Sequence, residues 1–298
     1  MIDGKAGGAL EPHLVYEDED LLVVYKPHRL HCALKAGGAR LSGGKVPSES
    51  SLASWVYERF PETAPTAFAG FAPPRGRSSL EGGLFHRLDY DTAGLVLFAR
   101  SPACLEALLA EQEGGRIEKT YRLEAAPSEG GLAGSRPAWT APRGIAIEEW
   151  GELLASLPKL GAALEPALGA LLTRSLIIEG RFRPWGPRGA RVACLVADET
   201  GKATRRHGSP PDLYRTELLS AVVAEGRLAL KARIRRGFRH QIRAHLAWIR
   251  LPLLGDSLYG GAPAADLHLV ATELAFLQPL SKRQLVLSDC QKDGSALT

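Results

Sequence analysis

The sequence predicts an α+β fold built on a mixed, mostly antiparallel sheet. Two observations carry this prediction: strand-like segments follow one another as hairpins rather than in strand–helix–strand order, and the chain contains no internal repeat. The alternation is clearest in the segment 228–236, where Leu228, Leu230, Ala232 and Ile234 face one way and Lys231, Arg233 and Arg235 face the other. One face of this predicted strand therefore suits a core, and the other face suits binding to phosphate groups.

The N-terminal segments predict three strands and a helix. His13–Tyr16 and Leu21–Tyr25 are short apolar segments on either side of an acidic turn. Pro27 ends the second of them, because proline offers no donor to a strand ladder. We expect a short helix at Ser51–Phe60, and the uncharged run Gly94–Ala99 predicts a buried strand.

The middle of the chain is more helical in pattern. Pro102–Gln112 carries leucines at helical spacing and stops before a pair of glycines, and Ile117–Leu123 is the next strand candidate. Glu148–Leu176 is rich in leucine and alanine, which predicts a helix. Pro158 and Pro166 are expected to break or kink it, because proline removes a helical hydrogen bond.

The C-terminal part returns to strands. Arg181–Arg191 is expected to be a basic loop that bears a tryptophan, since it holds two prolines and two glycines. Tyr214–Val223 and Leu228–Arg236 form the predicted hairpin, Arg239–Ile249 has the pattern of an amphipathic helix, and Leu267–Phe276 is a further strand.

Charge is unevenly distributed along the 298 residues, a length that allows one large domain or two. The formal net charge is only +4, yet residues 226–255 hold eight Lys or Arg and no Asp or Glu. Such a segment predicts a local basic surface that suits a polyanion. The alternative is a solvated basic face that binds nothing.

The four cysteines are far apart, with no CxxC pair, so neither a zinc site nor a disulfide framework is expected. The N-terminus lacks a basic-then-apolar signal, and no apolar run reaches the length that spans a membrane. We therefore expect a soluble, cytoplasmic protein.

The most informative stretch is a polar group of residues just before the strand at 94–99. A carboxylate such as Asp89 beside a buried strand is costly unless a cation accompanies it. Arg87 is long and could point elsewhere, so Arg243, further along the chain, is the second candidate cation. Arg243 lies off the stripe of Ile242, Leu246 and Ile249 that is expected to be buried, and could therefore reach a site.

Other known patterns fit less well. Asp89 and Asp91 invite comparison with the DxDx[TV] loop of aspartyl phosphatases, but the hydroxyl residue Thr92 comes one position early. A phosphate-binding P-loop fails at 44–46 because no Ser or Thr follows the lysine. His240 and His245 could be a metal pair, but no glutamate completes an HExxH motif.

The stretch 86–95 reads HRLDYDTAGL. It resembles the HRLDxxTSGL signature of the RluA-like family of RNA pseudouridine synthases. The stretch 237–246, GFRHQIRAHL, followed by 252–260, PLLGDSLYG, resembles GRTHQIRxHL…PxxGDxxYG. KTYR at 119–122, the opening strand pair and LHL at 267–269 match further family segments, in the same order.

The resemblance implies a pseudouridine synthase catalytic core, flanked by helices and loops and with a central cleft. It implies isomerisation of uridine to pseudouridine in RNA with no cofactor and no metal. Asp89 would be the nucleophile, and it could attack either the base or the sugar. Arg243 would be its bidentate ion-pair partner. Tyr121 would offer an aromatic face and a hydroxyl to the uracil. The alternative is an RNA-binding protein that keeps the fold and has lost turnover.

Further residues are expected to bind the substrate. Arg87 would fill the place of the flipped uridine, beside His86, while Ile242 and Leu267 would form an apolar pocket for the base. Phosphate contacts are expected from the loop 181–191 and from three basic residues of one strand: Lys231, Arg233 and Arg235. The expected partner is ribosomal RNA or tRNA, and the protein is expected to be a monomer that binds no membrane.

The resemblance also sets expected boundaries. Residues 1–12 would be disordered, 13–280 the catalytic domain with an insertion at about 145–180, and 281–298 a C-terminal tail. The S4-type domain of many relatives is not expected upstream. The chain departs from the family pattern at Ala93, at Phe238-Arg239 and at His28-Arg29, where the family has Ser, Arg-Thr, and a small residue followed by Gly.

Overall fold

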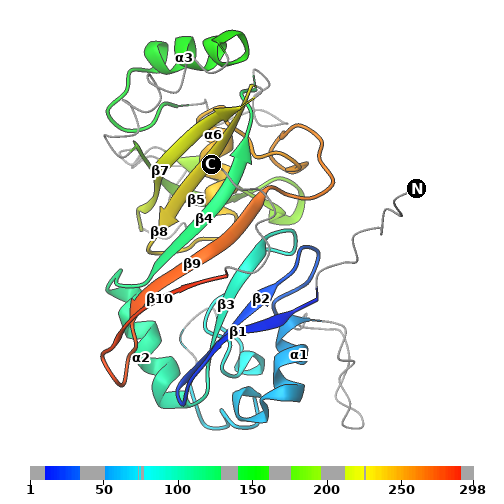
Figure 1. Cartoon of the computed structure of the whole chain (residues 1–298), viewed down its shortest axis with the longest axis vertical. Coiled ribbons are helices and arrows are strands. Elements are labelled where there is room, and N and C mark those ends of the chain that lie inside the picture. The colour runs from blue at the N-terminus through cyan, green and yellow to red at the C-terminus, as the bar shows by residue number, and fades with distance from the viewer. Residues whose placement is uncertain are drawn as a thin grey trace, which may run out of the picture. The chain divides into compact units, whose positions relative to one another are not determined.

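The computed structural model describes residues 11–33, 51–72, 74, 77–128, 140–160, 176–195, 212–224 and 226–289. The chain divides into two compact units. The first unit comprises Met1–Glu111 and Leu277–Thr298, and the second comprises Gln112–Phe276. Figure 1 labels the elements of both. Of the segment 1–12 that is expected to be disordered, residues 1–10 lie outside the described residues.

In the first unit, three antiparallel strands pair in the order β1-β2-β3. They are β1 (His13–Glu17), β2 (Leu21–Lys26) and β3 (Ala93–Ala99). Every residue of β3 is buried, as its lack of charge predicts. The helix α1 (Leu52–Arg59) begins at Ser51, whose hydroxyl accepts the Ser54 amide and so satisfies one free donor of the first turn.

The helix α2 (Pro102–Glu113) follows β3 closely and ends before the glycine pair, as expected. A strand that the sequence did not reveal, β10 (Gln284–Ser288), lies in the segment expected to be a C-terminal tail. Two short 3-10 turns, η1 (Pro61–Thr63) and η2 (Ser79–Glu81), interrupt the long proline- and glycine-rich connection before the Asp89 stretch.

In the second unit, six strands pair in the order β9-β4-β8-β7-β5-β6. They are β4 (Glu118–Ala125), β5 (Leu176–Trp185), β6 (Arg191–Leu195), β7 (Tyr214–Ala224), β8 (Arg227–Ile234) and β9 (Leu269–Leu277). All five pairings are antiparallel, which confirms the predicted α+β class with a mostly antiparallel sheet. The alternation of β8 is also confirmed: its apolar residues are buried and Lys231 is exposed.

The prediction of a loop at Arg181–Arg191 is wrong. This segment contains the end of β5, a 3-10 turn at Pro187–Gly189 and the start of β6. Strands β5 and β6 pair from Arg181 with Leu195 to Trp185 with Arg191. The burial of β5 alternates along its length, so the segment is a strand despite its prolines and glycines.

The helical segment expected at Glu148–Leu176 is also only partly right. The helix α3 (Ile147–Leu160) runs past Pro158, which therefore does not end it. Leu176 is the first residue of β5 rather than the end of a helix. Pro166 lies outside the described residues.

The helix α6 (Gln241–Trp248) corrects a third expectation. The sequence predicted one buried stripe, but all eight residues of this helix are buried. His240, just before it, has a left-handed backbone with φ of 56°. Arg243 is therefore enclosed by protein and needs a partner inside it.

Candidate active-site residues

Asp89 lies in a tight turn of the first unit, directly before the buried strand β3. The amide of Thr92 donates to the Asp89 carbonyl oxygen at 3.1 Å and closes the turn. Leu88 and Thr92 are buried, Tyr90 is exposed, and Asp89 itself is half-buried. A short polar turn between two buried segments thus presents the carboxylate at the edge of the core.

Lys26, at the end of β2, is fully buried beneath this turn. Its Nζ donates to the carbonyl oxygens of Pro27, Leu30 and Tyr90 at 2.9, 2.8 and 3.1 Å. Burial lowers the pKa of Lys26 to about 8, against the opposing effect of the Asp89 and Asp91 carboxylates. Lys26 was not among the predicted site residues, although it ends the strand pair that resembles the opening of the family pattern.

His86 and Arg87 lie just before the turn and differ in exposure. His86 is buried, with Nε2 3.3 Å from the Leu95 carbonyl oxygen. The Arg87 side chain is exposed, and its Nη1 pairs with the buried Glu81 carboxylate at 2.7 Å. Glu81 also lies near Arg77, with Nη2 and Oε2 3.7 Å apart. Arg87 therefore has a carboxylate partner within its own unit.

Arg243, in the second unit, forms a buried bidentate ion pair with Asp256. Its Nε and Nη2 lie 2.8 and 2.7 Å from the two Asp256 oxygens. The side chains are 3% and 0% exposed. The Asp256 carboxylate also accepts the amides of Leu258 and Tyr259, so its charge is well satisfied.

The turn that carries Asp256 needs the glycine before it. Gly255 has φ of 75°, and a Cβ there would lie 2.0 Å from the Asp266 carbonyl oxygen. The Tyr259 ring lies under the Arg243 guanidinium, 5.5 Å from its centre, and its hydroxyl accepts the Val192 amide. The quoted GDxxYG motif contained this aspartate and tyrosine, but the sequence alone did not show that they hold Arg243.

Tyr121, on β4, is 5% exposed and lies between two alanines of neighbouring strands, Ala232 on β8 and Ala271 on β9. Lys119 points to the same face of β4, and its burial lowers its pKa to about 8. The two expected pocket residues of the second unit, Ile242 and Leu267, are both buried.

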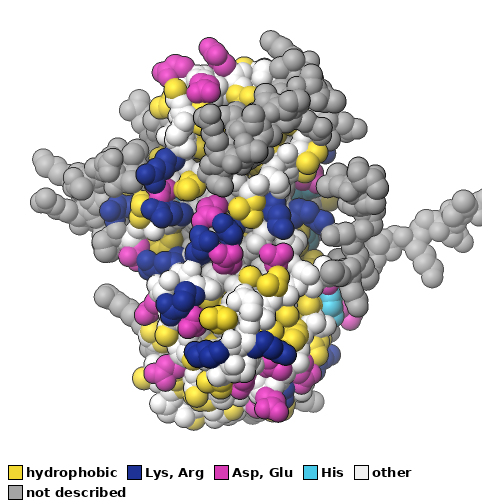
Figure 2. All heavy atoms as spheres, turned by 60° about the vertical axis from the view of Figure 1, so that its left-hand side comes forward, with side chains coloured by type: hydrophobic (Ala, Val, Ile, Leu, Met, Phe, Trp, Pro, Cys, Tyr) yellow, Lys and Arg dark blue, Asp and Glu magenta, His cyan; other side chains and the backbone are white. Residues whose placement is uncertain are grey.

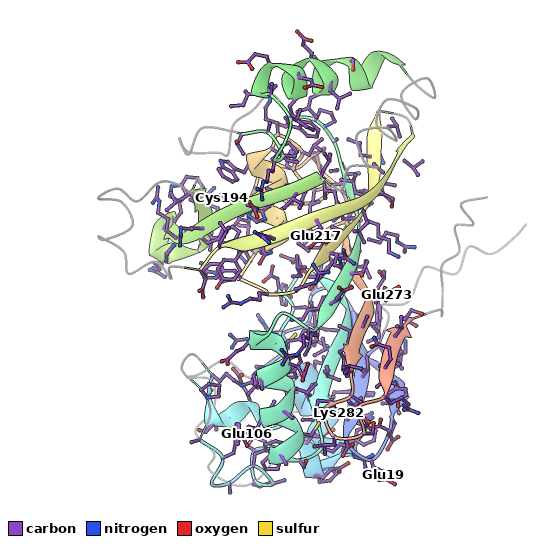
Figure 3. The ribbon with its side chains drawn as sticks, turned by 90° about the vertical axis from the view of Figure 1, so that its left-hand side faces the viewer. Glu19, Glu106, Cys194, Glu217, Glu273 and Lys282 are labelled. Carbon is purple, nitrogen blue, oxygen red and sulfur yellow. The ribbon has the colours of Figure 1, made fainter. Side chains whose placement is uncertain are left out.

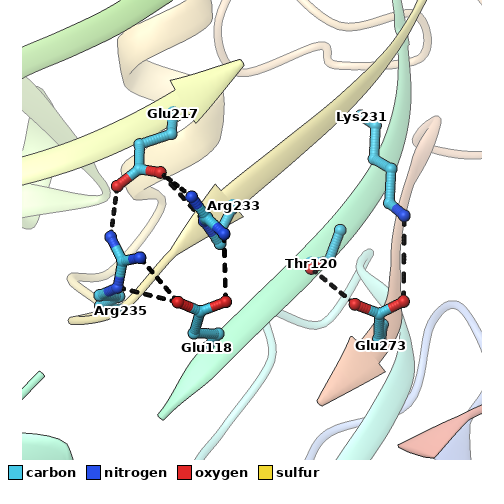
Figure 4. Close-up of polar contacts among 7 residues, drawn as sticks. All are labelled: Glu118, Thr120, Glu217, Lys231, Arg233, Arg235 and Glu273. Carbon is cyan, nitrogen blue, oxygen red and sulfur yellow. Dashed lines mark hydrogen bonds and ion pairs between the residues drawn. The ribbon is translucent and has the colours of Figure 1, made fainter. Parts of the chain in front are cut away.

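Arg233 of β8 and Arg235, just after the end of this strand, are paired with carboxylates from the neighbouring strands β4 and β7. Glu118, Glu217, Arg233 and Arg235 form a closed arrangement that we call the charge ring (Figure 4). Each arginine contacts both glutamates, at distances of 2.5 to 3.1 Å. Burial alone would lower the pKa of Arg233, but Glu217 and Glu118 raise it above its ordinary value.

Lys231 is paired more loosely, with Nζ 3.9 Å from the Glu273 carboxylate. Glu273 also accepts the Thr120 hydroxyl at 3.5 Å. Figure 3 labels Glu217 on β7 and Glu273 on β9, and Figure 2 shows lysine and arginine interspersed with acidic side chains on the face it displays. The segment 226–255 is basic in sequence, but the surface of β8 is mixed in charge.

The hairpin of β5 and β6 carries further arginines. The Arg191 guanidinium lies 4.2 Å from the centre of the Trp185 ring. Arg239, at one of the departures from the family pattern, donates to the carbonyl oxygens of Gly189 and Arg191. Phe238, at the same departure, stacks on Phe182 of β5 with ring centres 5.1 Å apart. These two unusual residues therefore join the hairpin to the segment that precedes α6.

Within the described ranges, no three His, Cys, Asp or Glu side chains gather closely enough to hold a metal ion. Among the same residues, no helix is long and apolar enough to cross a membrane.

The sequence model of the family described as RNA pseudouridylate synthase matches residues 20–248. The chain belongs to the RNA pseudouridylate synthase family. This confirms the resemblance derived from the motifs, and the matched span includes Asp89, Tyr121 and Arg243.

Relatives agree with this membership. The chain is 23% identical over 251 residues to ribosomal large subunit pseudouridine synthase D of Haemophilus influenzae, covering 84% of this chain and 53% of that protein. It is 24% identical over 272 residues to the protein of the same name from Yersinia pestis, covering 91% and 60%. The chain thus spans little more than half the length of these relatives.

A solved structure shares the fold. Human RNA pseudouridylate synthase domain containing 1 superposes with a TM-score of 0.54 at 15% identity, covering 96% of this chain and 86% of that one. Within this family fold, the first unit carries His86, Arg87 and Asp89. The second unit carries the other expected site residues: Tyr121, Lys231, Arg233, Arg235, Ile242, Arg243 and Leu267.

Proposed function

We propose that the protein isomerises specific uridines to pseudouridine in structured RNA of the cytoplasm. The observation that carries the proposal is the family match over residues 20–248, in which the aspartate, tyrosine and arginine of the family pattern are all present. The RNA would be ribosomal RNA or tRNA. The names of the relatives favour the large ribosomal subunit.

In this proposal Asp89 is the nucleophile. A carboxylate that forms a covalent intermediate divides one difficult step into two easier ones. The C1′–N1 bond breaks, the uracil turns, and C5 joins C1′, while C5 loses its proton and N1 gains one. Every atom of the substrate is retained, so the reaction needs no external donor.

Arg243 and Tyr121 have supporting roles in the proposal. Arg243 would hold and aim the nucleophilic carboxylate, and its bidentate pairing with Asp256 supports this by fixing the guanidinium plane. Tyr121 would offer a ring face to the uracil and a hydroxyl for proton transfer. The family pattern supports this, since Tyr121 fills its tyrosine position.

The remaining expected contacts stay part of the proposal. Arg87 would occupy the place of the flipped uridine, which requires it to leave Glu81, and His86 would help to shape that end of the site. Ile242 and Leu267 would contact the base. Phosphates would bind Lys231 and would have to share Arg233 and Arg235 with the charge ring.

The test is pseudouridine mapping across total RNA from cells with and without the gene. Cells that lack it are complemented with wild type, with Asp89→Asn or with Asp91→Asn, a matched change two residues away in the same turn. We expect one or a few sites to disappear with the gene, and to return with wild type and Asp91→Asn but not with Asp89→Asn. Rescue by Asp89→Asn would exclude this aspartate as the nucleophile.

A second measurement separates the proposal from its alternative. A protein that binds RNA without turnover would leave the pseudouridine map unchanged when the gene is removed. It would still bind RNA, and Asp89→Asn would not alter that binding. That pair of results would replace the enzyme by an RNA-binding protein of the same fold.

A further inference from the structure

The backbone around Asp89 is held by side chains from one short segment, residues 26–32. Lys26 binds the carbonyl oxygen of Tyr90, the residue after Asp89. Two further side chains of this segment also bind the turn. Cys32 contacts Leu88, the residue before Asp89, and His28 contacts Asp91, the residue after Tyr90. None of these contacts involves the Asp89 carboxylate itself.

Cys32 binds the residue before Asp89 with both functions of its thiol. The Leu88 amide donates to Sγ at 3.1 Å, and Sγ donates to the Leu88 carbonyl oxygen at 3.3 Å. The side chain is 4% exposed, and burial raises the pKa of the Cys32 thiol to about 11, so it keeps its proton near neutral pH. Both polar groups of Leu88 are thus fixed by one side chain.

His28 binds the residue two positions after Asp89. Its Nδ1 lies 2.6 Å from the Asp91 carbonyl oxygen. A carbonyl oxygen only accepts, so Nδ1 must carry the hydrogen, and this contact selects one tautomer of the ring. The next residue, Arg29, has a left-handed backbone with φ of 57°, which turns the chain between His28 and Cys32.

The contacts at residues 88, 90 and 91 leave the Asp89 backbone little freedom. The Thr92 amide adds a fourth restraint through the Asp89 carbonyl oxygen. The segment 26–32 therefore fixes the position of the Asp89 backbone, and this position determines where the Asp89 side chain points. Misplacement of a reacting group by about 1 Å can lower a rate by about 100-fold.

We propose that His28 and Cys32 are positioning residues, which fix the turn that carries Asp89 and thereby aim its carboxylate at the substrate. The proposal rests on the proposed function in one respect, since a rate can be measured only if the protein forms pseudouridine. Its structural half, that the two side chains hold the turn, can be measured without any activity. His28 lies where the family pattern has a small residue, so its part of this support is a feature of this chain.

The experiment compares substitutions that keep or remove the hydrogen bonds. Cys32→Ser keeps a group that donates and accepts, whereas Cys32→Val keeps the volume and removes both functions. His28→Asn places an amide nitrogen where Nδ1 lies, and His28→Leu removes the donor. All four full-length variants and wild type are assayed by single-turnover pseudouridine formation on RNA from cells that lack the gene.

We expect Cys32→Val and His28→Leu to lower the single-turnover rate by about 10- to 100-fold. RNA affinity in filter binding should stay within about twofold, because neither side chain is proposed to touch RNA. Cys32→Ser and His28→Asn should recover most of the rate. If Val and Ser at position 32 slow the reaction equally, or if neither slows it, positioning through hydrogen bonds is overturned.

Hydrogen exchange with mass spectrometry tests the structural half. The amide of Leu88 should exchange faster in Cys32→Val than in wild type or Cys32→Ser, while peptides from β3 stay unchanged. Unchanged exchange in the Val variant would show that the thiol does not hold the turn, whatever the activity. If wild type forms no pseudouridine, the proposed function fails, and the exchange result still decides whether these residues restrain the turn.

Discussion

His245 should make the protein sensitive to mild acid. It lies on α6 with no exposed surface, and its Nδ1 is 2.8 Å from the Thr216 hydroxyl. The rings of Phe182 and Trp248 lie nearby, with centres 4.8 and 6.4 Å away. Burial among these apolar rings lowers the pKa of His245 to about 3, because a charged imidazolium could not be solvated there.

The magnitude follows from the two pKa values. In the unfolded chain the histidine has a pKa of about 6.5, so below that pH the unfolded state binds a proton that the folded state excludes. Stability is therefore complete above about pH 6.5 and falls as the pH drops toward the folded value of about 3. Each pH unit costs about 1.4 kcal/mol, or about 2 kcal/mol between pH 6.5 and pH 5.

Urea unfolding at several pH values between about 7 and 5 measures this loss. The comparison is His245→Asn, which keeps a polar atom near Thr216 and removes the titrating group. We expect the wild type to lose about 2 kcal/mol more than the variant over this range, although the variant is less stable near pH 7 because its smaller side chain leaves a cavity. Equal pH dependence in both proteins would refute the assignment of a buried neutral imidazole.

Three further changes test other parts of the structure. Arg29→Gly should stabilise the protein by up to about 1 kcal/mol in thermal or urea unfolding, because Arg29 has φ of 57°; a clear loss would mean that its side-chain contacts outweigh this strain. Asp256→Asn should cost about 3–5 kcal/mol in urea unfolding, since it leaves the Arg243 charge buried with a neutral partner, and a loss below 1 kcal/mol would contradict that pairing. Changing Glu118 and Glu217 together to Gln should tighten RNA binding in filter assays and steepen its salt dependence, and the reverse result would exclude phosphate contacts at these arginines.

Local periodicity made much of the fold predictable. The residues of β8 alternate between apolar and basic, and those of β3 lack charge altogether, so each strand could be identified from its own segment. Asp89 could be singled out for the same reason, because an acidic residue beside such a strand is unusual. Arg243 could be noticed because it lies off the apolar stripe of its helix, and the family motifs then indicated its role and that of Tyr121.

What could not be predicted depends on pairing between distant segments. Strand β5 contains Gly180 and Pro184, and only its partners β6 and β7 show that it is extended. Helix α6 was expected to bury one stripe and to leave Arg243 off it, but Asp256 supplies the partner that lets this side be buried too. Sequence periodicity reports the environment of one element, whereas these outcomes depend on which element packs against it.

The charge ring shows how such pairing changes a functional inference. Register places Glu217 directly opposite Arg233, and the two glutamates together balance the two arginines. A phosphate that approaches this face replaces one anion by another, so it gains less than it would at an isolated arginine. The salt dependence of RNA binding should therefore count mainly the cations outside the ring, such as the loosely paired Lys231. We expect Lys231→Ala to reduce the slope of log K against log salt concentration by about 0.7 to 0.9, and Arg233→Ala to leave this slope unchanged, because the glutamates of the charge ring keep its arginines from binding phosphate. Equal changes in slope would show that phosphate displaces the glutamates.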